Sequence, residues 1–181
     1  MRNQPITEPQ ADTPSDEAPP PFAGYASPSE RPPLLSYSVL MGVFGALAGT
    51  SLLAAKRQGK DLPEQVSPRD LALIGVASHK VSRLISKDKV TSPIRAPFTE
   101  LEEEGGPSEL EEKPRGQGAR KAIGELISCP YCLDLWIVTA FSIGLLFAPR
   151  LTRFLTSAFS ALTISDFLQI AYKAAEKKGL G

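Results

Sequence analysis

The chain has 181 residues, of which 42% are hydrophobic and 22% charged, and its 20 basic side chains balance 20 acidic ones. This balance provides no field that would attract a polyanion, so we expect no nucleic acid among its partners. Two cysteines are too few for a disulfide framework. A single histidine excludes most histidine-based hydrolases.

The N-terminal segment 1–33 holds nine of the seventeen prolines and few large apolar residues. Such a composition cannot bury enough apolar surface to fold, so it predicts a disordered Pro-rich tail.

A membrane-spanning helix is predicted over residues 34–55, which contain no charged side chain. As a helix this segment would be about 33 Å long, which matches a hydrocarbon core of roughly 30 Å. Gly45 and Gly49 form a G-x-x-x-G pattern that would let a second copy or another partner helix approach closely. Glycines are also common in membrane helices without such a role, so both interpretations stay open.

Residues 67–86 have the pattern of an amphipathic helix. Leu71, Ile74, Val81 and Ile85 gather on one side, and Ser78, His79, Ser82, Arg83 and Ser86 gather on another. Its uncharged stretch is too short to span a membrane unaided, so the helix either crosses with its polar face inside a bundle or lies in the interface.

The remaining chain predicts a polar loop and two further spans. Residues 87–125 read as a cytoplasmic loop with a mobile acidic insert at 100–118, because prolines, glycines and glutamates dominate there. Residues 129–148 are the second span, and residues 154–172 a third, after a turn at Pro149 and Arg150. The expected fold is an all-α, polytopic membrane domain of three to four helices over residues 34–178.

Orientation follows from the lysine and arginine residues near the span ends. If the 67–86 helix lies on the membrane, 16 of these residues are on one side and 4 on the other. If it spans, 12 are on one side and 6 on the other. Both arrangements place the central loop and the C-terminus in the cytoplasm, and hence the protein in the inner, cytoplasmic membrane. They differ only in the side of the N-terminal tail.

The clearest chemical signal is Cys129-Pro130-Tyr131-Cys132 at the start of the second span. With Cys129 at the N-cap and Pro130 at the first helical position, the Cys129 sulfur faces free backbone amides, which favour a thiolate. Three interpretations compete: inert packing, a redox dithiol, and a metal site. Zinc or iron would be held by Cys129 and Cys132 together with His79 and a carboxylate such as Asp134 or Asp88.

A second group consists of ionisable residues near the apolar segments, namely Arg83, Asp88, Arg95, Asp134 and Asp166. Charges at membrane depth are costly and are usually paired or functional. The plainer expectation is structural, with Arg83 or Lys80 neutralising Asp134 or Asp166. Lys87, Lys89 and Arg95 could instead rest on the headgroups of membrane lipids.

Three strings resemble the bacterial membrane family catalogued as domain of unknown function 1360, some members of which carry a sporulation label. They are the segment from His79 to Thr99, the string GELISCPYCLDLW from Gly124 to Trp136, and SDFLQIAY from Ser165 to Tyr172. The resemblance implies a small polytopic membrane protein of unassigned activity. The resemblance implies that the following positions match the pattern of that family: His79, Arg83, Asp88, Arg95, Pro97, Cys129, Pro130, Cys132, Trp136 and Asp166.

The expected function is that of a structural or interaction protein. Its expected site combines the 79–99 segment with the Cys-Pro-Tyr-Cys turn and faces the cytoplasm. The alternatives are a membrane-bound dithiol oxidoreductase and a metal-binding module, so the sequence leaves enzymatic activity open.

Overall fold

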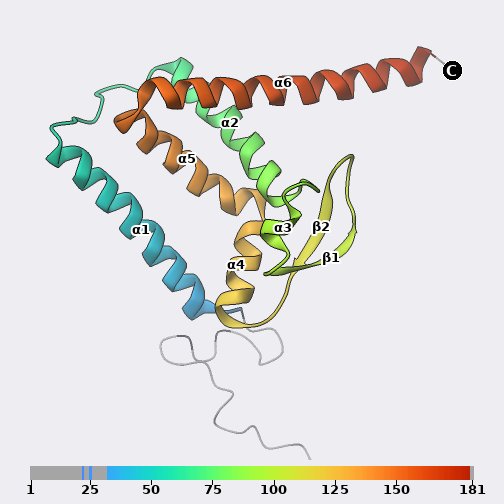
Figure 1. Ribbon diagram of the computed structural model, residues 1–181, viewed down its shortest axis with the longest axis horizontal. Coiled ribbons are helices and arrows are strands. Elements are labelled where there is room, and N and C mark those ends of the chain that lie inside the picture. Colours follow the sequence, from blue (N-terminus) through green and yellow to red (C-terminus); the bar gives the residue numbers. More distant parts are fainter. Residues whose placement is uncertain (1–21, 23–24, 26–31, 180–181) are drawn as a thin grey trace, which may run out of the picture.

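The computed structural model describes residues 22, 25 and 32–179. The predicted disordered tail therefore lies almost entirely outside the described residues. Six helices and one two-stranded sheet make up this part of the chain (Figure 1). The predominantly helical architecture is confirmed, but the all-α prediction is wrong for one segment, described below.

Helix α1 (Leu34–Arg57), helix α5 (Pro130–Phe147) and helix α6 (Pro149–Gly179) are each long and apolar enough to cross a membrane. The expected turn at Pro149 and Arg150 is absent among the described residues, because only Ala148 separates α5 from α6. Proline is tolerated in the first turn of a helix, where its missing N–H would have no partner. The third apolar helix thus begins five residues before the predicted 154.

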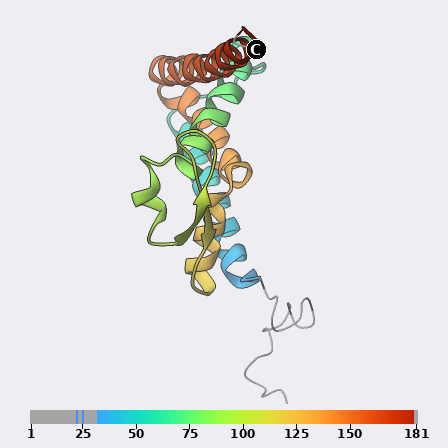
Figure 2. The same ribbon diagram turned by 90° about the vertical axis from the view of Figure 1, so that its right-hand side faces the viewer.

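Helices α1 and α5 run in the same direction, and helix α2 (Pro68–Ser86) runs against them. Lys60, just after α1, donates to the carbonyl of Leu146 at the end of α5. Near the start of α1, Tyr37 donates to Glu125 of helix α4 (Gly118–Ser128), which directly precedes α5. The start of α1 and α4 therefore lie at one end of the molecule, and α6 lies across the other (Figure 2).

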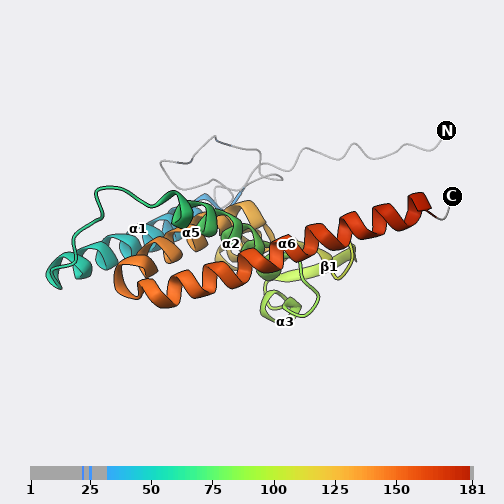
Figure 3. The same cartoon turned by 90° about the horizontal axis from the view of Figure 1, so that it is seen from above.

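Helix α6 begins beside the start of α2 and packs across it (Figure 1). Arg153 binds Asp70 at the start of α2, and Asp166 binds Lys80 ten residues further along. The second half of α6 then extends past the other helices (Figure 3). Helix α2 is consequently covered by α5 and by α6.

The packed faces of α2 and α6 are rich in small hydroxyl side chains, while many of their large apolar side chains are exposed. Ser78, Ser82 and Ser86 of α2 are buried, whereas Leu71 is 66% exposed. In α6 the buried residues form a stripe of small hydroxyl side chains, namely Thr152, Thr156, Ser160 and Thr163. Small residues at a helix interface with apolar residues outside are typical of membrane bundles. The polar face of α2 is thus buried against α5 and α6, while the crossing of a membrane by this helix stays a prediction.

The segment predicted as a polar loop is folded. It contains helix α3 (Ser92–Arg95), strand β1 (Thr99–Glu104), strand β2 (Leu110–Pro114) and helix α4. The two strands pair antiparallel with an irregularity between Leu101 and Glu103. The turn between them places Ser108 at φ 65°. The predicted mobile insert is therefore a β-hairpin.

The hairpin forms because its glutamates meet cations from outside the insert. Lys87 binds Glu111 at 2.6 Å and Arg83 binds Glu109 at 2.6 Å. Glutamate has a low intrinsic strand preference, so composition alone argues against strands here. The strands form nonetheless, because Arg83 of α2 and Lys87, which directly follows α2, neutralise glutamates of the hairpin.

Candidate functional site

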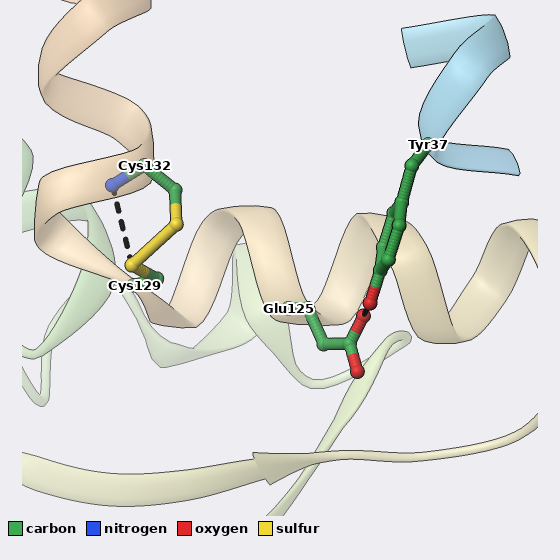
Figure 4. The surroundings of a disulfide bond; sticks show 4 residues. All are labelled: Tyr37, Glu125, Cys129 and Cys132. Carbon is green, nitrogen blue, oxygen red and sulfur yellow. Dashed lines mark hydrogen bonds between the residues drawn. A yellow bond between two sulfur atoms is a disulfide. The ribbon is translucent and has the colours of Figure 1, made fainter. Parts of the chain in front are cut away.

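The two cysteines lie at the junction of α4 and α5. Cys129 ends one helix and caps the next, with extended backbone angles of φ −103° and ψ 108°. Its sulfur accepts the backbone N–H of Cys132 at 3.2 Å (Figure 4). The predicted N-cap role of Cys129, with Pro130 at the first helical position, is confirmed.

Cys129 and Cys132 are joined in a disulfide, with their Cα atoms 5.3 Å apart. This separation is ordinary for a disulfide. Cys132 is an exposed residue, Cys129 is half-buried, and the intervening Tyr131 is 89% exposed. An incoming thiolate would therefore meet Cys132 first. The sulfur displaced by such an attack is that of Cys129, which the helix amide and the positive end of the helix dipole stabilise as an anion.

A second contact lies one helical turn before the disulfide. The hydroxyl of Tyr37 on α1 donates to the carboxylate of Glu125 on α4 (Figure 4). Because Glu125 precedes Cys129 by four residues, this contact attaches α1 to the last turn of α4 before the junction. Sequence patterns gave no signal for it, since the two residues are 88 positions apart.

The polar residues of the 79–99 segment divide between two assemblies, neither of which includes the cysteines. The first is a groove with a volume of about 780 Å³ between α2, the hairpin turn and α6. Four of the candidate residues line it: His79, Arg83, Asp88 and Asp166. The expected composite site of this segment and the cysteine turn is thus separated into distinct places.

Two ion pairs stabilise the walls of this groove. Lys80 binds Asp166 at 2.5 Å, which is one of the pairs that the sequence led us to expect. Arg83 does not reach either predicted aspartate, and binds both oxygens of Glu109 at 2.6 Å. The composition of the acidic insert predicts a mobile segment, so the sequence gives no signal for Glu109 as a partner of Arg83.

The second assembly is a buried clamp centred on Arg95, whose side chain is fully buried. Its guanidinium makes two hydrogen bonds of 2.9 Å to Glu112 of β2. It also donates to the carbonyl oxygens of Ile85 and Asp88, at the end of α2. Arg95 therefore anchors the hairpin to α2, and does not rest on lipid headgroups as the sequence allowed.

The environment of Glu112 favours its charged form. Burial by itself would raise the pKa of this carboxyl, but hydrogen bonds from Arg95 and Thr99 and the charges of Arg95 and Lys87 hold the pKa below its ordinary value. A buried pair of this kind is stable only while both partners are ionised.

The structure does not bring together the side chains of the predicted metal site. His79 is an exposed residue of the groove. Both cysteines are bonded to each other in the disulfide at the α4–α5 junction. Among residues 22, 25 and 32–179, no three His, Cys, Asp or Glu side chains are grouped so that they could hold a metal ion. The combination of Cys129, Cys132 and His79 is therefore not a preformed site.

Asp134 stands apart from both assemblies. Its Oδ1 atom is buried on α5 and has no hydrogen-bond partner within the described part of the chain. The predicted pairing of Asp134 with Lys80 or Arg83 is not formed, because those two cations are bound to Asp166 and Glu109.

Comparison with known proteins identifies one family. Residues 73–172 match the family described as "Protein of unknown function (DUF1360)". A segment of 69 residues is 35% identical to "Sporulation protein YjcA" of Bacillus subtilis (strain 168), covering 36% of this chain and 58% of that relative. The chain thus spans somewhat more than half the length of this curated relative. No solved structure matches the chain.

Proposed function

The chain belongs to the DUF1360 family, and we propose that it is a membrane structural or interaction protein that associates through α1. The observation that carries this proposal is the exposure of α1 within the chain. Of its 24 residues only Ala55 is buried, although the helix is apolar enough to span a membrane.

One face of α1 is suited to a second helix. A Cβ atom added at Gly42, Gly45 or Gly49 would meet nothing within 4 Å, so the glycines do not serve packing inside this chain. Helices in lipid associate through close backbone contact at such small residues. We expect a second copy of α1 to occupy this face.

The membrane orientation is part of the same proposal. Tyr37 near the start of α1 contacts α4, so the N-terminal tail and the central segment belong to one side if α1 and α5 both span. This corresponds to the 12 against 6 distribution of lysine and arginine. By the positive-inside tendency, this side, the hairpin and the C-terminus face the cytoplasm.

Association is tested by energy transfer between donor- and acceptor-labelled copies of the full chain in liposomes. We expect transfer in the wild type, and its loss in the double variant Gly45→Leu, Gly49→Leu, whose added bulk separates the helices. Leu47→Phe is the matched control, because Leu47 is also exposed on α1 but lies off the glycine face. Equal transfer in the double variant and the control, or a monomeric wild type, would contradict the proposal.

A second candidate function is thiol–disulfide exchange at Cys129 and Cys132. The exposure of Cys132 together with the N-cap position of Cys129 supports it. A substrate thiolate would attack the Cys132 sulfur and form a mixed disulfide, while the electron pair of the broken S–S bond leaves on Cys129. The second thiol of a dithiol substrate then releases Cys132, so the substrate is oxidised to a disulfide and both cysteines are reduced.

This exchange is tested with single-cysteine variants and glutathione disulfide. Cys129→Ser retains the exposed Cys132 and should form the mixed disulfide faster than Cys132→Ser, measured by intact-protein mass spectrometry. If both variants react equally slowly and the wild-type disulfide resists a dithiol reductant, the cysteines serve packing only.

A further inference from the structure

The groove between α2, the hairpin turn and α6 has the size of a ligand site. Its volume of about 780 Å³ lies within the range typical of small-molecule pockets. It is distinct from the glycine face of α1 and from the disulfide, so it can be tested independently of both proposed functions.

One wall of the groove is apolar and belongs to a helix suited to the membrane. Phe167 and Ile170 of α6 line it and are 63% and 64% exposed. Leu84 of α2 adds an apolar side chain to the lining. Because α6 is apolar enough to lie in a bilayer, hydrocarbon chains are natural neighbours of this wall.

The charged side chains of the lining balance one another. Three cations, Lys80, Arg83 and Lys173, are matched by three carboxylates, Asp88, Glu109 and Asp166. A groove of zero net charge does not concentrate anions, which distinguishes it from a basic patch that selects acidic lipids.

Some of these charged side chains form ion pairs with one another, and others do not. Lys80 is bound to Asp166 and Arg83 to Glu109. Among the described residues, Lys173 has no ion-pair partner, and the Asp88 carboxylate accepts a hydrogen bond only from the backbone N–H of Val90. Within the part of the chain that the structure describes, the groove therefore offers one free cation and one free carboxylate beside an apolar wall.

We propose that this groove binds the headgroup of a zwitterionic phospholipid that carries a primary ammonium group. Lys173, supported by the imidazole of His79, faces the phosphodiester, and Asp88 accepts the ammonium. The acyl chains follow the apolar wall along α6. An anionic headgroup without an ammonium, such as that of phosphatidylglycerol, would leave Asp88 without a counterion.

The test uses the full-length protein in detergent micelles and short-chain phospholipids whose binding is measured by isothermal titration calorimetry. We expect dihexanoyl phosphatidylethanolamine to bind, and Lys173→Gln and Asp88→Asn each to raise its Kd about tenfold, as expected for the loss of one hydrogen bond to a charged group. Lys178→Gln, a change of the same kind further along α6 and outside the groove, should leave Kd unchanged.

The probes also separate the competing explanations. Equal or tighter binding of dihexanoyl phosphatidylglycerol would show a preference for negative charge and overturn the proposal. Binding of free phosphoethanolamine as tight as that of the lipid would replace the lipid with a soluble ligand. Because Lys173 is an exposed residue, its variant should unfold like the wild type. Unchanged lipid binding by folded Lys173→Gln would place the lipid elsewhere.

Discussion

Arg95 and Glu112 form a buried ion pair between α3 and strand β2, with side-chain exposures of 0% and 6%. The same guanidinium donates to the carbonyl of Ile85 at 2.7 Å, and Thr99 donates to Glu112 at 2.7 Å. A single side chain thus connects the end of α2, the short helix α3 and the hairpin. These connections make the central segment a folded unit on the membrane helices.

Replacing Arg95 with methionine should destabilise the protein by about 3–5 kcal/mol, because Glu112 would remain buried without its counterion. The measurement is denaturant unfolding of detergent-solubilised protein, followed by hydrogen exchange of the hairpin amides. Adding Glu112→Leu should recover part of the loss, since the second change removes the orphaned charge. A single variant as stable as the wild type would show that the clamp does not support the fold.

Acid should loosen the same clamp. The pKa of Glu112 is lower in the folded protein than its ordinary value of 4.5, so its stabilisation is fully present above that value. The stabilisation is lost as the pH falls through the folded pKa. We expect the hairpin amides to exchange faster, relative to the intrinsic rate, below about pH 4. Glu112→Gln should show weaker pH dependence over this range, and an unchanged dependence would assign the effect to another carboxyl.

Gly124 provides a test of the packing between α4 and the hairpin. A Cβ atom at this position would lie 2.5 Å from the backbone oxygen of Phe98 and 3.1 Å from Pro114. Gly124→Ala should therefore cost about 1–3 kcal/mol through overpacking, despite the better helix propensity of alanine. Gly75→Ala in α2 is the matched control, because its Cβ would meet nothing within 4 Å. Equal unfolding midpoints would contradict the packing of α4 on the hairpin.

Reporter fusions test the proposed orientation. Fusions at the N-terminus and in the hairpin turn at Gly106 should report the cytoplasm, because α1 and α5 run in the same direction. A fusion at Gly181 should report the cytoplasm as well, if α6 spans and returns the chain to that side. Insertion in the connection between α1 and α2, at Gly59, should report the opposite side. A cytoplasmic signal at Gly59 together with an external N-terminus would show that α2 lies on the membrane surface instead of crossing it.

Several features could be predicted because their signals are local in the sequence. The uncharged run from residue 34 is long enough for a span whatever it packs against, and α1 indeed begins at Leu34. The Cys129-Pro130 start of α5 depends on backbone donors within three residues, so the N-cap could be recognised directly. The three strings that resemble the family all lie within residues 73–172, where the family match is found.

Other features depended on contacts between distant residues. The sequence pattern leaves open whether the serine-rich side of α2 lies inside a bundle or in the membrane interface, and only the positions of α5 and α6 show that this side is buried. The glutamate-rich composition predicts a mobile insert, since most of the cations that pair with these glutamates lie in α2, in α3 or between them. Lys87 and Glu111 lie 24 positions apart, and Lys80 and Asp166 lie 86 apart.

The sequence by itself determined which segments are apolar enough for the membrane and where the cysteine-capped helix begins, because hydrophobic length and helix capping act over a few neighbouring residues. Only the tertiary structure decided that the acidic insert folds as a hairpin, and that His79, Arg83, Asp88 and Asp166 share a groove without the cysteines. The reason is electrostatic: a charged side chain is stabilised by whichever counterion the fold brings within a few ångströms, and separation along the chain does not specify that counterion.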